Sequence, residues 1–110
     1  ADFLFPGEGE YADRRYPADR LAMLAVKTSC KDRWRQVLAE ADRIQTKHLL
    51  TMEPAISKIQ TAEMQGQRLQ LVLPTSLHST YKADQRAWLM SFRDFLGMVR
   101  DLRGLQRLFI

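Results

Sequence analysis

The chain has 110 residues, of which 45% are hydrophobic and 27% are charged, a composition typical of one small globular domain and not of a disordered or fibrous protein. Its single cysteine, Cys30, excludes a disulfide framework and a zinc site built from several cysteines, and no apolar run approaches the roughly 20 residues that span a bilayer. The formal net charge of +4, from 17 Lys and Arg against 13 Asp and Glu, favours an anionic partner only weakly.

The first quarter of the chain is expected to hold two strands joined by a loop. Residues 2–5 predict a short apolar strand that ends at the turn pair Pro6-Gly7. Residues 7–20 are polar and predict a long surface loop. Residues 21–26 are continuously apolar, which predicts a strand covered on both faces, with a short buried helix as the alternative. Because the chain opens directly on an apolar strand, we expect it to be part of a longer protein.

The rest of the chain alternates between helix and strand patterns. Apolar residues at helical spacing predict a helix over residues 31–44, and residues 47–52 predict a strand. A weaker helix over 55–65 and a strand over 69–73 follow. The last element is a helix over 83–101, with an apolar side that includes Trp88, Phe92 and Phe95 and is expected to be core or a partner-facing surface. This alternation predicts an α/β fold with a mixed or parallel sheet.

Lys27 is the first residue that suggests a reaction, because it ends an apolar strand, where an ammonium group is costly without partners. Asp2 lies at the mouth of another predicted strand, and Glu40 lies on the helix that follows Lys27. If the two strands are neighbours, the three side chains can converge. Two carboxylates and a lysine suit a nuclease that uses Mg²⁺, which prefers oxygen ligands. The alternative is a strand-end lysine that reaches solvent.

The start of the predicted helix carries three basic residues, Lys31, Arg33 and Arg35, around Asp32. Positive charge at a helix N-terminus opposes the helix dipole, so a nucleic-acid partner would explain it. Lys and Arg read guanine and Asp reads cytosine in the major groove, so this run could read G·C pairs. A solvated helix start is the simpler explanation.

Helical geometry would place Arg33, Gln36 and Glu40 on one edge of this helix. At 1.5 Å per residue, Glu40 would lie roughly 10 Å beyond Arg33 along the axis. One helix could then carry base-reading groups at its start and a metal ligand further along.

Four segments of the sequence resemble a known family. The densest match is residues 27–44, beginning Lys27-Thr28-Ser29-Cys30-Lys31-Asp32-Arg33-Trp34. Residues 2–7, 47–50 and 71–78 are also similar to it. Together they resemble the catalytic domain of EcoRII-type restriction endonucleases, which belong to the PD-(D/E)xK nucleases, in the variant whose second acidic residue has moved to the helix.

The resemblance implies a restriction-endonuclease-like mixed sheet flanked by helices, with residues 1–110 forming the C-terminal portion of the catalytic domain. It implies Asp2 and Glu40 as Mg²⁺ ligands and Lys27 as the catalytic lysine. It also implies that Lys31, Asp32 and Arg33 read the outer base pairs of a palindromic CC…GG site, of the CCWGG kind, in double-stranded DNA. The expected protein is a homodimeric type II enzyme of the prokaryotic cytoplasm, with no membrane association.

Two other functions fit part of the same pattern. A repair or junction nuclease of the PD-(D/E)xK class would share Asp2, Lys27 and Glu40 but would lack the base-reading run. A DNA-binding or interaction module would lack catalysis altogether. The remaining candidate side chains, His48, His78 and Cys30, are expected to serve structure.

Overall fold

A computed structural model describes residues 2–30 and 33–108, with side chains described as far as residue 102. Within these ranges the strands form one sheet whose spatial order is the order along the chain. The strands are β1 (Phe3–Phe5), β2 (Ala22–Val26), β3 (Lys47–Leu50), β4 (Leu69–Leu73) and β5 (Met90–Ser91). β1 runs antiparallel to β2, and the other neighbouring pairs are parallel. The prediction of a mixed α/β sheet is confirmed.

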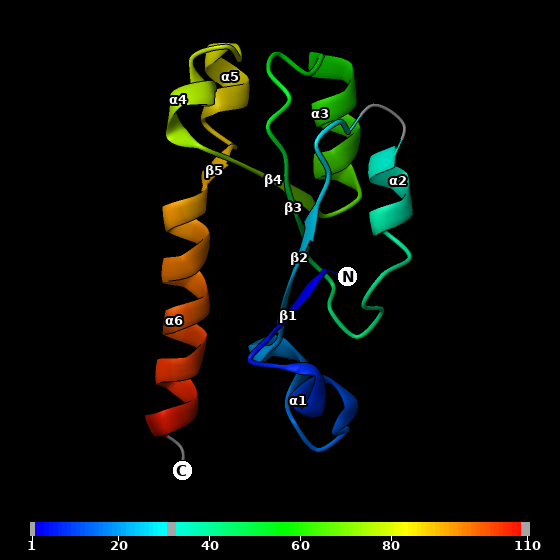
Figure 1. The fold of residues 1–110 in the computed structure, drawn as a ribbon, viewed down its shortest axis with the longest axis vertical. Coiled ribbons are helices and arrows are strands. Elements are labelled where there is room, and N and C mark those ends of the chain that lie inside the picture. The colour runs from blue at the N-terminus through cyan, green and yellow to red at the C-terminus, as the bar shows by residue number, and fades with distance from the viewer. Residues whose placement is uncertain (1, 31–32, 109–110) are drawn as a thin grey trace.

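Helices cover both faces of this sheet (Figure 1). They are α1 (Glu8–Ala12), the 3₁₀ helix η1 (Ala18–Arg20), α2 (Trp34–Val37), α3 (Lys58–Gly66), α4 (Thr75–His78), α5 (Ala83–Arg86) and α6 (Phe92–Leu108). The prediction of a loop over residues 7–20 was wrong, because α1 and η1 lie within it. No helix in the described part of the chain is long and apolar enough to cross a membrane.

The strand β2 contributes to both cores, as its continuous apolar sequence predicts. Because side chains alternate along a strand, Met23 and Ala25 join the core under α2 and α3, whereas Ala22 and Leu24 join the core under α6. Phe95 of α6 is fully buried in the second core. β2, the strand that leads to Lys27, is therefore packed between the two cores.

The helix predicted over residues 31–44 is much shorter, since α2 ends at Val37. Ala41 lies in the left-handed region, with φ 48°, and this conformation cannot continue a right-handed helix. The buried residues Trp34, Val37 and Ile44 still face the core, so the apolar spacing identified the buried side chains but not the length of the helix.

The helix predicted over residues 83–101 is interrupted by β5, which pairs with the end of β4. The interruption sends its apolar side chains to opposite faces of the sheet. Trp88 and Leu89 pack against the core under α2 and α3, and Phe95 and Val99 lie in the core under α6.

In the segment before β4, α3 begins at Lys58 because the Ser57 side chain caps it by accepting from the Gln60 N–H.

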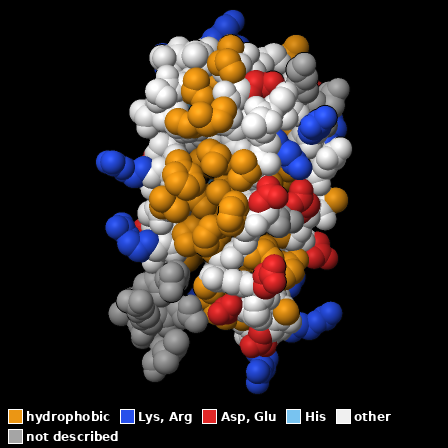
Figure 2. All heavy atoms as spheres, in the orientation of Figure 1, with side chains coloured by type: hydrophobic (Ala, Val, Ile, Leu, Met, Phe, Trp, Pro, Cys, Tyr) orange, Lys and Arg blue, Asp and Glu red, His pale blue; other side chains and the backbone are white. Residues whose placement is uncertain are grey.

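Hydrophobic side chains gather over the centre of the face shown in Figure 2, with Asp and Glu side chains beside them. Among the large apolar residues described, Phe3, Val26, Phe92 and Leu96 are each more than one-third exposed. Phe92 and Leu96 lie on α6, next to the buried Phe95, and Phe3 and Val26 lie on β1 and β2.

Candidate active site

Asp2 and Lys27 lie at the same edge of the sheet. In the antiparallel pair of β1 and β2, Phe3 lies opposite Leu24, so Asp2 lies beside the end of β2. Its carboxylate oxygen Oδ2 accepts a hydrogen bond from the Val26 backbone N–H at 2.6 Å, one residue before Lys27. The neighbouring strands on which the predicted convergence depends are therefore present.

The end of β2 is also fixed from its other side. The Lys27 backbone N–H donates to the carbonyl oxygen of Leu50 on β3 at 3.0 Å, which continues the parallel ladder one residue beyond β2. Lys27 itself is half-buried. The Asp2 contact on one side and the pairing with β3 on the other therefore determine where the base of its side chain lies.

Glu40 does not lie on a helix, so the predicted helical edge of Arg33, Gln36 and Glu40 is wrong. α2 ends three residues earlier, and the Glu40 N–H donates to the carbonyl oxygen of Val37 at 3.0 Å in a turn. The meeting of Glu40 with Asp2 and Lys27 stays a prediction. Within the described ranges, no group of three or more His, Cys, Asp or Glu side chains could hold a metal ion.

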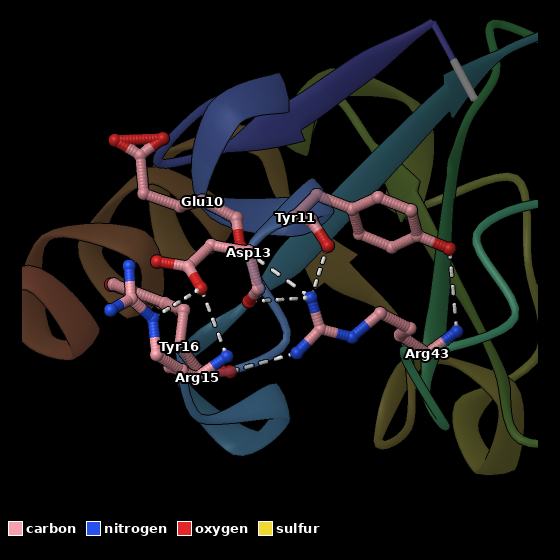
Figure 3. A network of polar contacts seen from close by, with 6 residues as sticks. All are labelled: Glu10, Tyr11, Asp13, Arg15, Tyr16 and Arg43. Carbon is pink, nitrogen blue, oxygen red and sulfur yellow. Dashed lines mark hydrogen bonds and ion pairs between the residues drawn. The ribbon is translucent and has the colours of Figure 1, made fainter.

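An arginine anchors the turn that carries Glu40 to the segment that follows β1 (Figure 3). The Arg43 guanidinium donates to the backbone oxygens of Asp13 at 3.2 Å and Tyr16 at 2.7 Å, and also to that of Tyr11. The Tyr11 hydroxyl in turn donates to Asp42 at 2.8 Å. The turn that holds Glu40 is thereby joined to α1, next to the strand that follows Asp2.

Lys47, at the start of β3, has a structural role that its sequence position did not reveal. Its ammonium group donates to the carbonyl oxygens of Ala41, at 2.6 Å, and Ile44, and the residue is 5% exposed. Burial lowers the pKa of Lys47, while the negative charges of Asp42 and Glu40 oppose that change. The lysine therefore holds the same turn from the sheet side.

The predicted base-reading run falls partly outside the described residues, because Lys31 and Asp32 are among those not described. Arg33 is exposed and lies immediately before α2. Arg35, two residues further on, stacks over the Trp34 ring at 4.4 Å and pairs with Glu63 of α3. Arg33 makes neither of these two contacts, and it is the other basic residue of this run that the structure describes.

Glu53, just after β3, is a second residue that the sequence did not single out. Its carboxylate accepts hydrogen bonds from the Ser29 hydroxyl at 3.1 Å and the Cys30 N–H at 3.3 Å. The only sequence signal is its place three residues after the end of β3, which adjoins β2. Its partners lie more than 20 positions earlier in the chain, so no local pattern predicts the contact.

Cys30, His48 and His78, which were expected to serve structure, lie in packed or hydrogen-bonded positions. Cys30 is fully buried, and burial raises the pKa of its thiol. The His78 ring nitrogen Nε2 lies 3.0 Å from the carbonyl oxygen of Leu73. His48 packs against Phe95 with ring centroids 5.0 Å apart, and burial lowers its pKa to about 4.

A mixed sheet covered by α6 on one face and by α2 and α3 on the other, with an acidic residue and a lysine at adjoining strand ends, defines a restriction-endonuclease-like α/β domain. The family model described as EcoRII C terminal matches residues 1–96, and the chain belongs to that family. It is 48% identical over 104 residues to "Type II restriction enzyme EcoRII" of Escherichia coli.

Solved structures give the same fold. The chain is similar to metal-depleted Ecl18kI in complex with uncleaved DNA, with a TM-score of 0.75 and 22% identity, and to the complex with uncleaved, modified DNA, with a TM-score of 0.75 and 20% identity. Each match covers 90% of this chain and 33% of the Ecl18kI chain. The EcoRII match covers 94% of this chain and 25% of that enzyme, so the chain spans a quarter to a third of the length of these relatives.

Proposed function

We propose that this chain is the catalytic and DNA-reading part of a type II restriction endonuclease that hydrolyses double-stranded DNA at a palindromic CC…GG site of the CCWGG kind. The observation that supports this most directly is the contact of Asp2 with the end of β2, one residue before Lys27. The 48% identity to a named type II restriction enzyme supports the same reaction class.

In the proposed mechanism, Asp2 and Glu40 hold Mg²⁺, which is a hard cation and prefers carboxylate oxygens. Asp2 suits this role, because it uses only Oδ2 for Val26, and Oδ1 makes no hydrogen bond with a described residue. When bound, the ion polarises the scissile phosphate and makes a bound water more acidic. The hydrogen bond from the Val26 N–H orients the Asp2 carboxylate before any ion binds.

Lys27 acts on the phosphate and on the attacking water. Its ammonium group orients the water and offsets the negative charge that develops on phosphorus oxygens in the transition state. The backbone bond from Lys27 to Leu50 fixes where the base of this side chain leaves the end of β2. The expected product carries a 5′-phosphate.

Sequence reading is assigned to Lys31, Asp32 and Arg33, whose donor and acceptor groups match the outer G·C pairs of a CC…GG site. Because the site is palindromic, two copies related by a two-fold axis are expected to read its halves. We therefore propose a homodimer on DNA.

The proposal is tested by cleavage of a supercoiled plasmid that carries CC…GG sites, with Mg²⁺ and with EDTA. The wild-type chain should give discrete fragments with Mg²⁺ only, and Lys27→Ala should cut at least about 100-fold more slowly while binding the same duplex. Lys82→Ala, a lysine exposed elsewhere, is the matched control. A smear of fragments would indicate a nuclease without this site, and binding without cleavage would indicate a non-catalytic module.

A further inference from the structure

The carboxylate of Glu53 joins the segment just before Lys31 to the end of β3. Its Oε1 atom accepts from the Ser29 hydroxyl at 3.1 Å, and its Oε2 atom accepts from the Cys30 backbone N–H at 3.3 Å. Both oxygens are therefore engaged by neutral donors of one short segment. This arrangement differs from that of Asp2, whose carboxylate accepts through one oxygen.

The backbone of Glu53 is itself fixed by buried groups. The Tyr81 hydroxyl donates to the Glu53 carbonyl oxygen at 2.6 Å, and Tyr81 is 2% exposed. Burial raises the pKa of Tyr81 to about 12, so the hydroxyl keeps the proton that it donates. The Thr51 hydroxyl accepts from the Glu53 N–H at 3.2 Å and donates to the Thr28 carbonyl oxygen at 3.3 Å. Glu53 is thus a rigid support and not a mobile surface side chain.

The position of Arg33 depends on the residue that Glu53 holds. The carbonyl oxygen of Cys30 accepts from the Arg33 N–H at 2.6 Å and from the Trp34 N–H at 3.2 Å. Cys30 and Trp34 are both at most 1% exposed. The backbone of Cys30 therefore connects Glu53 to Arg33. Its N–H is held by the Glu53 carboxylate, and its carbonyl oxygen holds the backbone N–H of Arg33.

A carboxylate near a DNA-reading segment needs a structural reason, because DNA is a dense array of negative charges and repels it. The two hydrogen bonds from Ser29 and Cys30 supply that reason. Reading a base pair requires donors placed to within fractions of an ångström, and supporting contacts provide that precision. Repulsion from the phosphates lowers affinity for all sequences alike, whereas correct placement of Arg33 affects only the difference between sequences.

We infer that Glu53 is a positioning residue for base recognition: its carboxylate sets the Ser29–Cys30 backbone, and through Cys30 it sets where Arg33 meets the outer G·C pairs. The inference rests on the proposed function of residues 31–33 as readers. It assigns a share of the sequence specificity to a residue that follows β3.

The first test compares Glu53→Gln with the wild-type chain in binding to a CC…GG duplex and to a duplex with altered outer pairs. A glutamine has one acceptor oxygen and an NH₂ group, so it cannot accept from both the Ser29 hydroxyl and the Cys30 N–H. We expect the preference for the CC…GG duplex to fall at least about 10-fold, with little loss of binding to the altered duplex. Ser29→Ala should give a smaller fall, and the double variant should lose less than the product of the two.

Glu63→Gln is the matched control, because it removes the same charge from a carboxylate that contacts α2 through Arg35. Both variants raise non-specific DNA binding equally, since each removes one negative charge. Only Glu53→Gln should reduce the preference. If the two glutamine variants have the same preference, or if Glu53→Gln weakens binding to both duplexes by the same factor, the inference is wrong.

A second test does not depend on DNA and separates this inference from the proposed function. In Glu53→Ala, hydrogen exchange measured by NMR should become at least about 10-fold faster at the Cys30 amide and at the Arg33 and Trp34 amides. Amides of β4 should keep the wild-type rate. If Arg33 and Trp34 exchange as in the wild type, Glu53 does not position them. If exchange accelerates but the wild-type chain prefers no duplex, the reader role in the proposed function is wrong.

Discussion

The Asp2 carboxylate accepts a hydrogen bond from the backbone N–H of Val26 at 2.6 Å. This bond joins the residue proposed to hold the metal ion to the strand that ends at Lys27, the residue proposed to assist the attacking water. It also gives Asp2 an observed role and a proposed one: its oxygen accepts a hydrogen bond within the fold, and its negative charge would serve the proposed metal ion. The two roles can be tested with different substitutions.

Asp2→Asn keeps an oxygen that accepts from Val26 but removes the negative charge. We expect its free energy of unfolding to stay within about 0.5 kcal/mol of the wild type, because the position is exposed, while Mg²⁺ binding measured by titration calorimetry is lost. Asp2→Ala should lose Mg²⁺ binding and also about 1 kcal/mol of stability, because it removes the hydrogen bond. Wild-type Mg²⁺ affinity in Asp2→Asn would contradict the proposed ligand role.

Arg43→Lys tests the network drawn in Figure 3. A lysine ammonium cannot present the planar set of donors with which Arg43 reaches the carbonyl oxygens of Tyr11, Asp13 and Tyr16. We expect a loss of about 2–4 kcal/mol in the free energy of unfolding measured in urea. A lysine at this position should therefore loosen the turn that carries Glu40.

The control for this variant lies in the same network. Arg15 forms an ion pair with Asp13, but its side chain is 93% exposed, and exposed pairs contribute little. Arg15→Lys should change stability by less than about 0.5 kcal/mol. Equal losses in the two variants would mean that the carbonyl contacts of Arg43 contribute nothing beyond surface charge.

His48 gives the fold a pH dependence with a definite sign. Burial lowers its folded-state pKa from 6.5 to about 4, so the unfolded chain binds a proton more readily between these values. The contribution of neutral His48 to the free energy of unfolding is therefore fully present above pH 6.5. It is lost as the pH drops toward 4, by roughly 3 kcal/mol in all. In His48→Met this part of the slope should disappear from urea unfolding measured across the same range. An unchanged slope would assign the acid sensitivity to other groups.

The sequence predicted the strands best where burial alone determines them. β2 is a continuous apolar run and β4 is apolar except for Gln70, because helices cover both faces of the sheet, and β4 has the predicted bounds. That the strands of Asp2 and Lys27 are neighbours was only a condition of the sequence argument, and the pairing of β1 with β2 meets it. The sequence missed what long-range contacts determine, such as β5, which exists because Met90 pairs with Val72 of β4.

The helix that was expected to carry Glu40 was predicted too long for a different reason. Apolar spacing continues through Ala41 and Ile44, and those side chains are indeed directed toward the core. Spacing cannot reveal that Ala41 has a positive φ, or that the Lys47 ammonium group holds the carbonyls of the resulting turn. Glu53 was missed because its contacts join segments more than 20 positions apart.

The loop after Glu53 contains a position where glycine should stabilise the protein. Ala55 is exposed and has φ 52°, a left-handed conformation that costs a residue with a Cβ about 1 kcal/mol. Ala55→Gly should therefore raise the free energy of unfolding by about 0.5–1 kcal/mol, measured by thermal or urea unfolding. Ala62→Gly is the matched control, because Ala62 is equally exposed but lies within α3, where glycine should lower stability by about 1 kcal/mol. Since the two variants remove the same methyl group, opposite signs can arise only from the backbone conformation, and a loss of stability in both would contradict the left-handed conformation at Ala55.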